Sequence, residues 1–218
     1  MPSTPKTRYP LEEALHWRYA TKLFDPAKKI GPDDWQLIKD SLRLAPSSAG
    51  LQPWKFILVE DPALRLALRE ASRGQAQITD ASHLVVLASH RKLDVALVDK
   101  YVARVSEVRG QSLEELAGLR NGVINILVDG PRAATIEAWA QRQTYIPMGF
   151  AMLAAAQLGI DSCPMEGFDT KAYDKLLGLE GGPWATVAAL PLGYRSEADK
   201  YGRLPKVRFE EKDVFEVR

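Results

Sequence analysis

The chain has 218 residues, of which 46% are hydrophobic and 26% are charged, with 29 basic side chains against 28 acidic ones. This composition is that of an ordinary globular protein with enough residues to bury a substantial core. A net charge of +1 disfavours nucleic acid or an acidic membrane surface as the main partner, because proteins that bind these polyanions usually carry a large basic surplus. Any anion site must therefore be local.

The sequence shows no pair of cysteines, no apolar signal segment and no membrane-spanning stretch, and these observations indicate the cellular compartment. Cys163 is the single cysteine, so no internal disulfide can form. Residues 1–10 contain almost no apolar side chains and predict a loose arm without the apolar segment of a signal peptide. The longest uncharged apolar stretch, residues 146–159, is shorter than the roughly 20 residues that span a bilayer. We expect a cytoplasmic protein with no membrane segment and, since no His, Cys or carboxylate cluster has zinc-ligand spacing, no metal.

The first fifty residues predict two helices and a turn. Residues 11–19 have a helical pattern, with Glu12 and Glu13 in the first turn, where carboxylates favour the helix dipole. Pro32 starts a second helix, which has an apolar stripe. The stripe consists of Trp35, Leu37, Ile38 and Leu42. The sequence Pro-Ser-Ser-Ala-Gly at residues 46–50 ends this helix.

Short apolar runs rich in β-forming residues predict three strands, at residues 54–60, 84–89 and 185–194. The first two have no polar alternation, so we expect both to be covered on both faces. Between the strands, residues 62–72 and 93–108 predict helices, and Ser112 with Glu115 forms a capping box that starts another.

Residues 131–158 carry the longest helical signal, and beyond Arg142 this helix is apolar on every side. Such a helix must be buried all round, which in a chain of this size is easiest if a second subunit covers it. Gly159 is placed to end it as a left-handed cap. Residues 195–218 have scattered apolar side chains without a helical period and predict an extended tail that lies across another surface. We expect one α+β domain over residues 1–218, with the tail packed on a partner subunit.

Three segments are candidates for binding an anion or a polar ligand. Arg18 and Lys22 are one helical turn apart and either point at one anion or are simply solvated. The serine-rich segment at residues 46–54 either binds a polar ligand through its hydroxyls and amides or is a plain turn. A basic run without an intervening acid either closes over a phosphate or stays in water. This run consists of Lys200, Arg203, Lys206 and Arg208.

Five motifs occur in order along the chain. They are RYATKLFD at residues 18–25, APSSAGLQPW at 45–54, DASH at 80–83, CPMEGFD at 163–169 and LPKVR at 204–208. Taken together, these motifs closely resemble the nitroreductase family of FMN-dependent NAD(P)H oxidoreductases. The resemblance implies an α+β fold with a central mixed β-sheet flanked by helices, assembled as an intertwined homodimer. It also implies one FMN at each of two sites in the dimer interface.

The resemblance implies that both subunits contribute cofactor-binding residues, while no side chain acts as a nucleophile or general acid. The phosphate and ribityl group would be bound by Arg18, Tyr19, Ala20, Lys22, Lys206 and Arg208. The flavin ring would be contacted by Gln77, Pro164, Met165, Glu166 and Gly167, with the backbone amides of the last two near N5. The other subunit would contribute Pro46, Ser47, Ser48, Gly50 and Gln143.

Several positions depart from the family pattern. Ala20 and Gly50 stand where the family commonly has Ser and Asn, and Gly74 stands where an Asn contacts the flavin. Gln77 in place of a Lys would stabilise the anionic reduced flavin less and lower its potential. Residues 100–130, which cover the substrate face in this family, match poorly, so the sequence leaves the acceptor undetermined.

The resemblance implies a ping-pong reaction in which NADH or NADPH gives hydride to FMN N5 and a small-molecule acceptor, such as a nitroaromatic or a quinone, then takes it. A specialised dehydrogenase or reductive dehalogenase could use the same flavin site. A flavin-binding or non-enzymatic dimeric protein is the alternative from another class. We interpret Cys163 as a buried structural thiol rather than a redox group, and His83, Trp139 and Tyr145 as packing residues.

Overall fold

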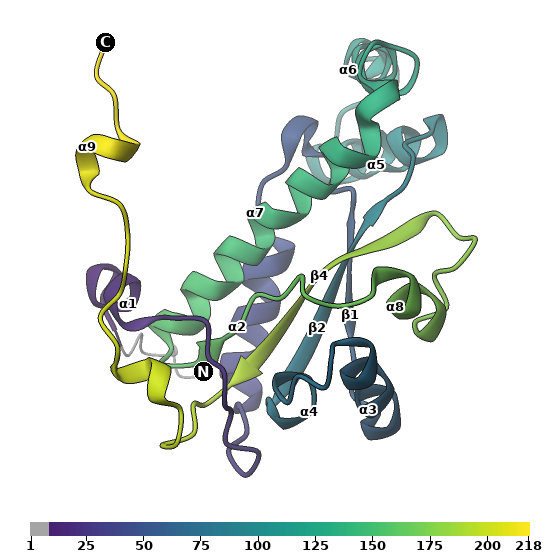
Figure 1. Ribbon diagram of the computed structural model, residues 1–218. Coiled ribbons are helices and arrows are strands. Elements are labelled where there is room, and N and C mark those ends of the chain that lie inside the picture. The colour runs from purple at the N-terminus through teal and green to yellow at the C-terminus, as the bar shows by residue number, and fades with distance from the viewer. Residues whose placement is uncertain (1–8) are drawn as a thin grey trace.

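The computed structural model describes residues 9–218 and shows one antiparallel sheet between two layers of helices (Figure 1). The strands are β1 (Trp54–Leu58), β2 (His83–His90), β3 (Asp161–Ser162) and β4 (Trp184–Gly193), and they lie in the order β1-β2-β4-β3. All pairs among them are antiparallel. The α+β class is confirmed, but the sheet expected to be mixed is antiparallel in its four strands; the one parallel pairing among residues 9–218 is an isolated bridge between Ala20 and Ser162.

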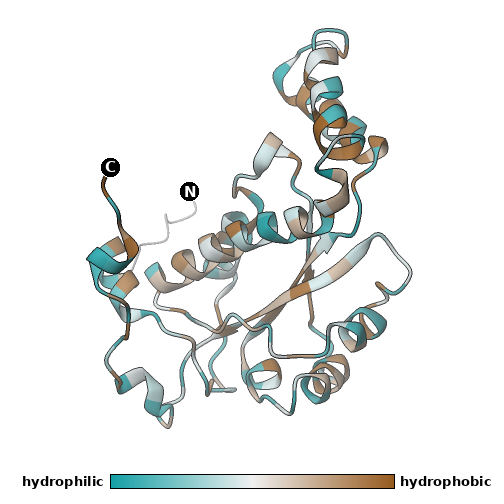
Figure 2. Cartoon of the chain, turned by 45° about the horizontal axis from the view of Figure 1, so that its top comes forward, coloured by the Kyte–Doolittle hydropathy of each residue, from teal (hydrophilic) through white to brown (hydrophobic). Residues whose placement is uncertain are grey.

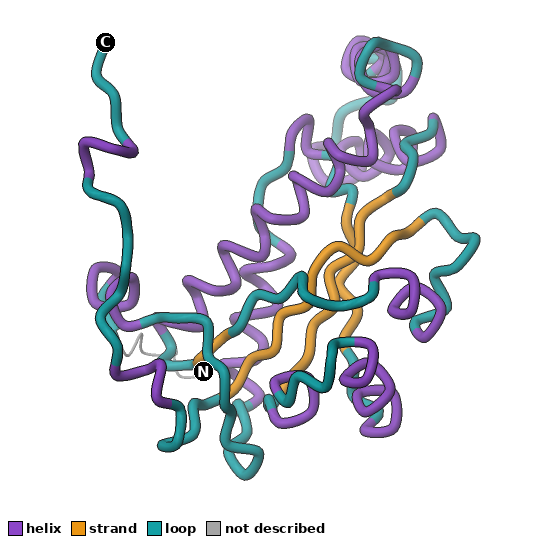
Figure 3. The backbone as a smooth tube through the Cα atoms, in the orientation of Figure 1, coloured by secondary structure: helices purple, strands orange, loops and turns teal. Residues whose placement is uncertain are grey.

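The helices alternate with the strands along most of the chain (Figure 3). They are α1 (Leu11–Trp17), α2 (Pro32–Arg43), α3 (Pro62–Ala71), α4 (Gln77–Asp80), α5 (Val95–Arg109), α6 (Ala117–Val123), α7 (Ile136–Gln157), α8 (Thr170–Leu176) and α9 (Glu211–Val214). Short 3-10 turns occur at Ser48–Gly50, Ala133–Thr135 and Lys200–Arg203, and Ile124–Val128 forms a turn of π-helix. Most of the loose arm expected at residues 1–10 lies outside the described residues.

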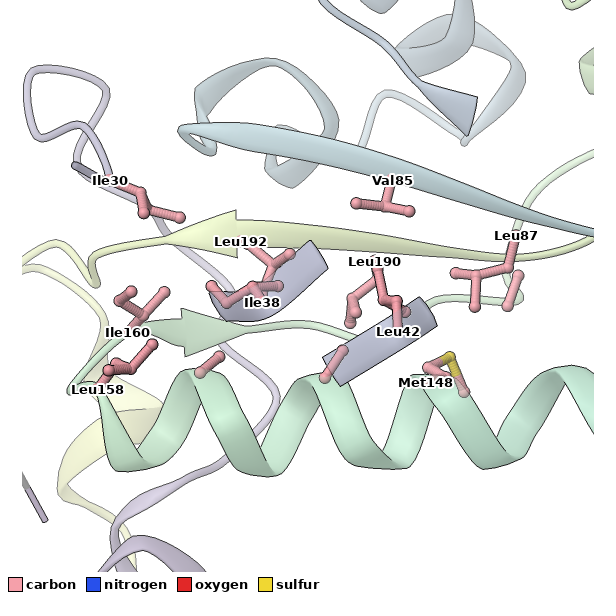
Figure 4. Close-up of a cluster of buried hydrophobic side chains, with 13 residues drawn as sticks. Ile30, Ile38, Leu42, Val85, Leu87, Met148, Leu158, Ile160, Leu190 and Leu192 are labelled. Carbon is pink, nitrogen blue, oxygen red and sulfur yellow. The ribbon is translucent and has the colours of Figure 1, made fainter. Parts of the chain in front are cut away.

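The core has a separate layer on each face of the sheet. In β2, Val85 and Leu87 point to the layer formed by α2 and α7, which Figure 4 shows in close-up. Leu84 and Val86 point to the opposite layer, which α3, α4 and α8 cover. Alternate side chains of a strand face opposite sides, so β2 is buried on both faces as expected.

The expectation that the first strand is also covered on both faces is wrong. β1 is an edge strand, and its Leu58 side chain is 40% exposed. Lys55 is exposed as well. The composition of this run resembles that of a central strand, but its position at the edge depends on the order of the strands, which no local pattern specifies.

Helix α7 is the longest helix, as expected, although it begins at Ile136 because residues 131–135 form turns. It ends at a Schellman motif: Gly159 has φ 70°, and the N–H groups of Gly159 and Ile160 donate to the carbonyls of Ala156 and Ala155. Within one chain the helix is not buried all round, because Phe150 remains 49% exposed. This side of the helix is therefore open in the single chain.

Beyond Gly193 the chain leaves the sheet and runs along the outside of the molecule (Figure 1). Apolar side chains of this tail are exposed: Val207 by 84%, Phe209 by 83% and Val217 by 98%. Figure 2 shows this apolar character near the C-terminal end. In the single chain, the apolar side chains of residues 204–218 are therefore mostly exposed and bury little surface. No helix of the described residues is long and apolar enough to cross a membrane.

Candidate functional site

A cavity of about 430 Å³ lies where the end of α1 meets the beginning of the tail. The described residues that line it come from two distant parts of the sequence and include no carboxylate. They are His16, Trp17, Arg18, Tyr19 and Ala20, and Tyr201, Gly202, Leu204, Pro205, Lys206, Val207 and Arg208. Because three of them are cations and none is acidic, the cavity is electropositive.

The three cations are close enough to affect one another. Burial lowers the pKa of the Arg18 guanidinium, and the charge of Arg208 lowers it further. The pKa of Lys206 is lowered by burial and by the charges of Arg18 and Arg208. The Nε of Arg18 is buried and has no hydrogen-bond partner. An anion in this cavity would relieve the repulsion and satisfy the unpartnered donor.

Lys206 is held in place by α1. Its ammonium donates hydrogen bonds to the carbonyl oxygens of Leu15 and Arg18, at the negative end of the helix. An ammonium carries three N–H groups, so one remains for a ligand. The tail thus closes the cavity by capping the helix that forms its other wall.

Two buried carboxylates position the walls of the cavity. Asp199 is 3% exposed and accepts hydrogen bonds from the N–H groups of Lys22, Leu23 and Tyr201 and from the Tyr19 hydroxyl. Burial by itself would raise the pKa of Asp199, but these donors outweigh it and the pKa lies below its usual value. The same site raises the pKa of Tyr19 to about 12, mainly through burial.

The second carboxylate, Asp161, holds the strand that leads into the tail. It accepts hydrogen bonds from the backbone N–H and the guanidinium of Arg195 and from the Thr21 hydroxyl. The Arg195 guanidinium also lies 4.1 Å from the centre of the Trp17 ring, on the cavity wall. No local pattern in the sequence marks Asp161, Arg195 or Asp199, since their partners come from other segments.

Lys22 is placed differently from Arg18. Its side chain does not line the cavity, but its charge opposes the effect of burial on Cys163, whose pKa is nevertheless raised by that burial. The thiol is 1% exposed and also interacts with the Gln77 side chain. Lys22 and Gln77 therefore both interact with Cys163, the residue that precedes residues 164–167.

Residues 164–167 form a segment that is fixed at both ends, with Met165 buried in the core and Glu166 and Gly167 on the surface. Met165 pairs with Ala189 of β4 through hydrogen bonds of 2.8 and 2.9 Å. The Gln75 side chain donates to the carbonyl of Gly167 at 3.0 Å. Among the described residues, the N–H groups of Glu166 and Gly167 have no hydrogen-bond partner, so they are available to a ligand.

Tyr145 of α7 also belongs to this surface, although the sequence suggested only a packing role. Its hydroxyl donates a hydrogen bond of 2.6 Å to Glu166 Oε1. Burial, this hydrogen bond and the Glu166 charge together raise the pKa of Tyr145 to about 12. Its position two residues after Gln143 places the two side chains on different sides of α7, so no local pattern in the sequence identifies this role.

Residues 46–50 meet Gln143 but not the cationic cavity. The N–H of Ser48 donates to Gln143 Oε1 at 2.9 Å. The segment is strained, because Ala49 has φ 55° although it is not glycine. Ser48 and Ala49 line another cavity, of about 340 Å³, together with Gly118, Leu119, Gly122, Val123, Ile126, Leu127 and Arg132.

The two groups of candidate residues lie toward opposite ends of α7. Gln143 holds residues 46–50, whereas the N–H of Tyr9, two residues before α1, donates to the carbonyl of Gln157. Fourteen residues of helix between these anchors correspond to about 21 Å along its axis. One chain therefore does not bring residues 46–50 to the cationic cavity.

A sequence model described as the nitroreductase family matches residues 15–194. Among curated relatives, a Bacillus subtilis protein provisionally named NAD(P)H nitroreductase YfkO is 36% identical over 214 residues, which cover 93% of this chain and 94% of the relative. A Staphylococcus epidermidis protein provisionally named NAD(P)H nitroreductase SERP2086 is 37% identical over 213 residues, with the same coverage.

Solved structures share the fold. A protein from Exiguobacterium sibiricum, provisionally named a nitroreductase and crystallised in complex with FMN, matches with a TM-score of 0.83 at 19% identity, over 99% of this chain and 100% of its own. The enone reductase CLA-ER, which acts in gut-bacterial fatty acid saturation, matches with a TM-score of 0.79 at 21% identity, over 97% of this chain and 99% of its own. At these identities the matches show the fold alone.

Proposed function

The chain belongs to the nitroreductase family, and on that premise we propose that it binds FMN and uses it to pass electrons from NADH or NADPH to a small-molecule acceptor. The observation that carries this proposal is the cavity with three cations, no carboxylate and an unpartnered Arg18 Nε. A cofactor phosphate is the kind of anion that such a cavity stabilises.

The residues present fit an FMN molecule. Arg18, Lys206 and Arg208 would bind the phosphate, and the free third N–H of Lys206 would reach it without breaking its bonds to α1. Ala20 has no hydroxyl to add to this set. Tyr19 lines the same cavity and would flank the ribityl group.

The flavin ring would lie on residues 164–167, next to Cys163 and the side chains of Lys22 and Gln77 that interact with it. When bound, FMN would supply the chemistry by accepting hydride from NAD(P)H and giving it to the acceptor. The protein's part is to bind and orient: Pro164 and Met165 support the ring, and the free N–H groups of Glu166 and Gly167 donate to its edge. No side chain needs to act as a nucleophile.

We propose that the site is completed in a homodimer formed by single-domain chains. Residues 46–50 and Gln143 lie away from the cationic cavity of their own chain, so they would serve the cavity of the partner. Two further features support this proposal: the open side of α7 around Phe150 and the exposed apolar side chains of the tail both need a covering surface. The tail from residue 195 would pack on the partner.

For the acceptor we propose a nitroaromatic, a quinone or a similar planar molecule that replaces NAD(P)H over the ring in a ping-pong sequence. The single buried cysteine suits a reducing compartment, and we propose a cytoplasmic location. The family also contains the alternatives of a specialised dehydrogenase or dehalogenase, but no feature of the described site favours them.

The test starts from the purified protein. We expect flavin absorption bands that NADH or NADPH bleaches under anaerobic conditions and that menadione or a nitroarene restores. Flavin that binds but is not bleached would identify a flavin-binding protein without this activity. Failure to bind FMN after reconstitution would contradict the whole proposal.

A further inference from the structure

A cavity at the other end of the sheet is lined by side chains to which the proposed function assigns no role. It lies where β1 and β4 begin and β2 ends, beneath α5, and measures about 400 Å³. Its walls contain four aromatic side chains and three cations. The lining residues are Leu51, Gln52, Trp54, Lys55, His90, Leu97, Lys100, Tyr101, Arg104 and Trp184.

Two of the aromatic side chains are brought together by the register of the sheet. His90 pairs with Trp184, so these two rings lie on one face of the sheet, whereas Trp54 pairs with Ser89 and borders the cavity from the opposite face. The His90 and Trp184 rings are 3.8 Å apart between centroids. Such a wall can stack against a planar apolar ligand.

The charges are of one sign, because none of the described residues that line the cavity carries a carboxylate. Lys55 Nζ lies 4.7 Å from the centre of the Trp184 ring. Lys100 has no described partner, and Arg104 pairs only with Glu107, in an exposed pair that contributes little. The ammonium groups of Lys55 and Lys100 also act on His90, whose pKa is lowered first by burial and then by these charges, against the opposing effect of Asp94.

We propose that this cavity binds an aromatic anion, that is, a planar ring system carrying a carboxylate or phosphate. The ring would stack on the wall formed by His90 and Trp184, and the anionic group would meet Lys55, Lys100 and Arg104. The ligand is separate from the proposed cofactor, since the two cavities share no residue.

The cavity is connected to residues 46–50 through Tyr101. A Cβ built on Gly50 would lie 2.4 Å from the Tyr101 hydroxyl, so ring and glycine are in direct contact. A ligand that moves Tyr101 would therefore change the surroundings of Gly50. This gives the site a physical route to the segment that we place against the partner's flavin.

The test uses the full chain loaded with FMN, so that the cationic cavity is filled, and measures binding by isothermal titration. One arm compares 1-naphthoate with the neutral 1-naphthylmethanol, and a second compares adenosine 5′-monophosphate with adenosine. We expect at least one anion of the two arms to bind and its neutral partner to bind about tenfold more weakly, because the charge-assisted contacts are lost. The arm that binds tells an aromatic carboxylate from a nucleotide.

Two variants locate the binding. Lys55→Gln combined with Lys100→Gln should weaken the bound anion about tenfold or more, whereas Arg109→Gln, an exposed change at the end of the same helix, should leave it unchanged. Circular dichroism and the FMN content would confirm that the double variant is folded. Equal binding of the anion and its neutral partner, equal weakening by Arg109→Gln, or no binding of either anion would overturn the proposal.

Discussion

The ammonium of Lys206 donates a hydrogen bond of 2.6 Å to the carbonyl oxygen of Arg18, across 188 positions of sequence. This contact links the tail to α1 and brings Arg208 close enough to lower the pKa of the Arg18 guanidinium. Like charges held together in this way raise the free energy of the empty site. An anion that neutralises them recovers that energy on binding.

The first prediction concerns the phosphate. Arg208→Ala should weaken FMN binding roughly tenfold to a hundredfold, because it removes a charge-assisted contact of about 1.5 to 3 kcal/mol. Riboflavin, which lacks the phosphate, should lose far less affinity. Fluorescence titration of both flavins measures the effect. Arg203→Ala is the matched control, since Arg203 belongs to the same tail but does not line the cavity; an equal loss in both variants would contradict the assignment.

The second prediction concerns which subunit contributes Arg18 and which contributes Ser48 to one FMN site. Arg18→Ala and Ser48→Trp should each bind FMN poorly as homodimers; Ser48 is exposed, so the tryptophan fills space without disturbing the core. If the halves come from different subunits, a mixed dimer has one site with both changes and one with neither. FMN content measured on dimers carrying two different tags should then recover to half. No recovery would mean that each site is built within one chain.

The main elements of the fold could be predicted because their signals are local. The apolar stripe of α2, the continuous apolar run of β2 and the glycine that ends α7 each depend on residues near one another in sequence. The two-residue strand β3 is too short to have a pattern. The edge position of β1 depends on which strands pair, and burial of one face cannot be inferred before the order of the strands is known.

The residues of the candidate site also divide into those with a local signal in the sequence and those that depend on distant contacts. Arg18 and the basic run at residues 200–208 could be identified from charge alone. The sequence does not reveal, however, that Lys206 donates two hydrogen bonds to carbonyl oxygens at the end of α1. Asp199 is an isolated acid in the sequence, and its role depends on donors that lie almost the whole chain away. Tyr145 lies in an apolar stretch of helix and therefore looks like a core residue in the sequence; its contact with Glu166 is known only from the structure. Contacts between distant segments carry no local signal.

The third prediction concerns Asp199. Asp199→Asn should destabilise the protein by about 1 to 3 kcal/mol, because the amide NH₂ cannot accept the hydrogen bonds that several N–H groups now donate to the carboxylate. Since the folded-state pKa lies below the usual value of 3.8, this stabilisation is fully present above that value and is lost as the pH falls through the folded-state pKa. Urea unfolding from neutral to acidic pH should show the wild type and the variant converging only at the acidic end. The exposed Asp213→Asn is the control.

The fourth prediction concerns Tyr145 and Glu166. In Glu166→Gln the carboxylate charge is removed, so the pKa of Tyr145 should fall from about 12 toward the usual value of 10.0, while burial keeps it raised. NMR of ¹³Cζ-labelled tyrosine, with Tyr145→Phe to assign the signal, follows this titration. Glu180→Gln, on an exposed turn, should leave the signal unchanged. An identical Tyr145 titration in the wild type and Glu166→Gln would show that the two side chains do not interact in solution.

The last prediction concerns Gly50, a position at which the resemblance implies that Asn is common. Gly50 has φ 71°, a conformation that Asn also tolerates, so the backbone alone does not require glycine. The obstacle is the Tyr101 hydroxyl, which lies 2.4 Å from where a Cβ would be. Gly50→Asn should therefore destabilise the protein by about 1 to 3 kcal/mol, as overpacking does. In the double variant with Tyr101→Leu most of this loss should disappear, so a double-mutant cycle of unfolding free energies should give a coupling well above the error of additivity, about 0.5 kcal/mol. Additive losses would mean that Tyr101 does not occupy this space, and that Gly50 is required for the conformation of residues 46–50 itself.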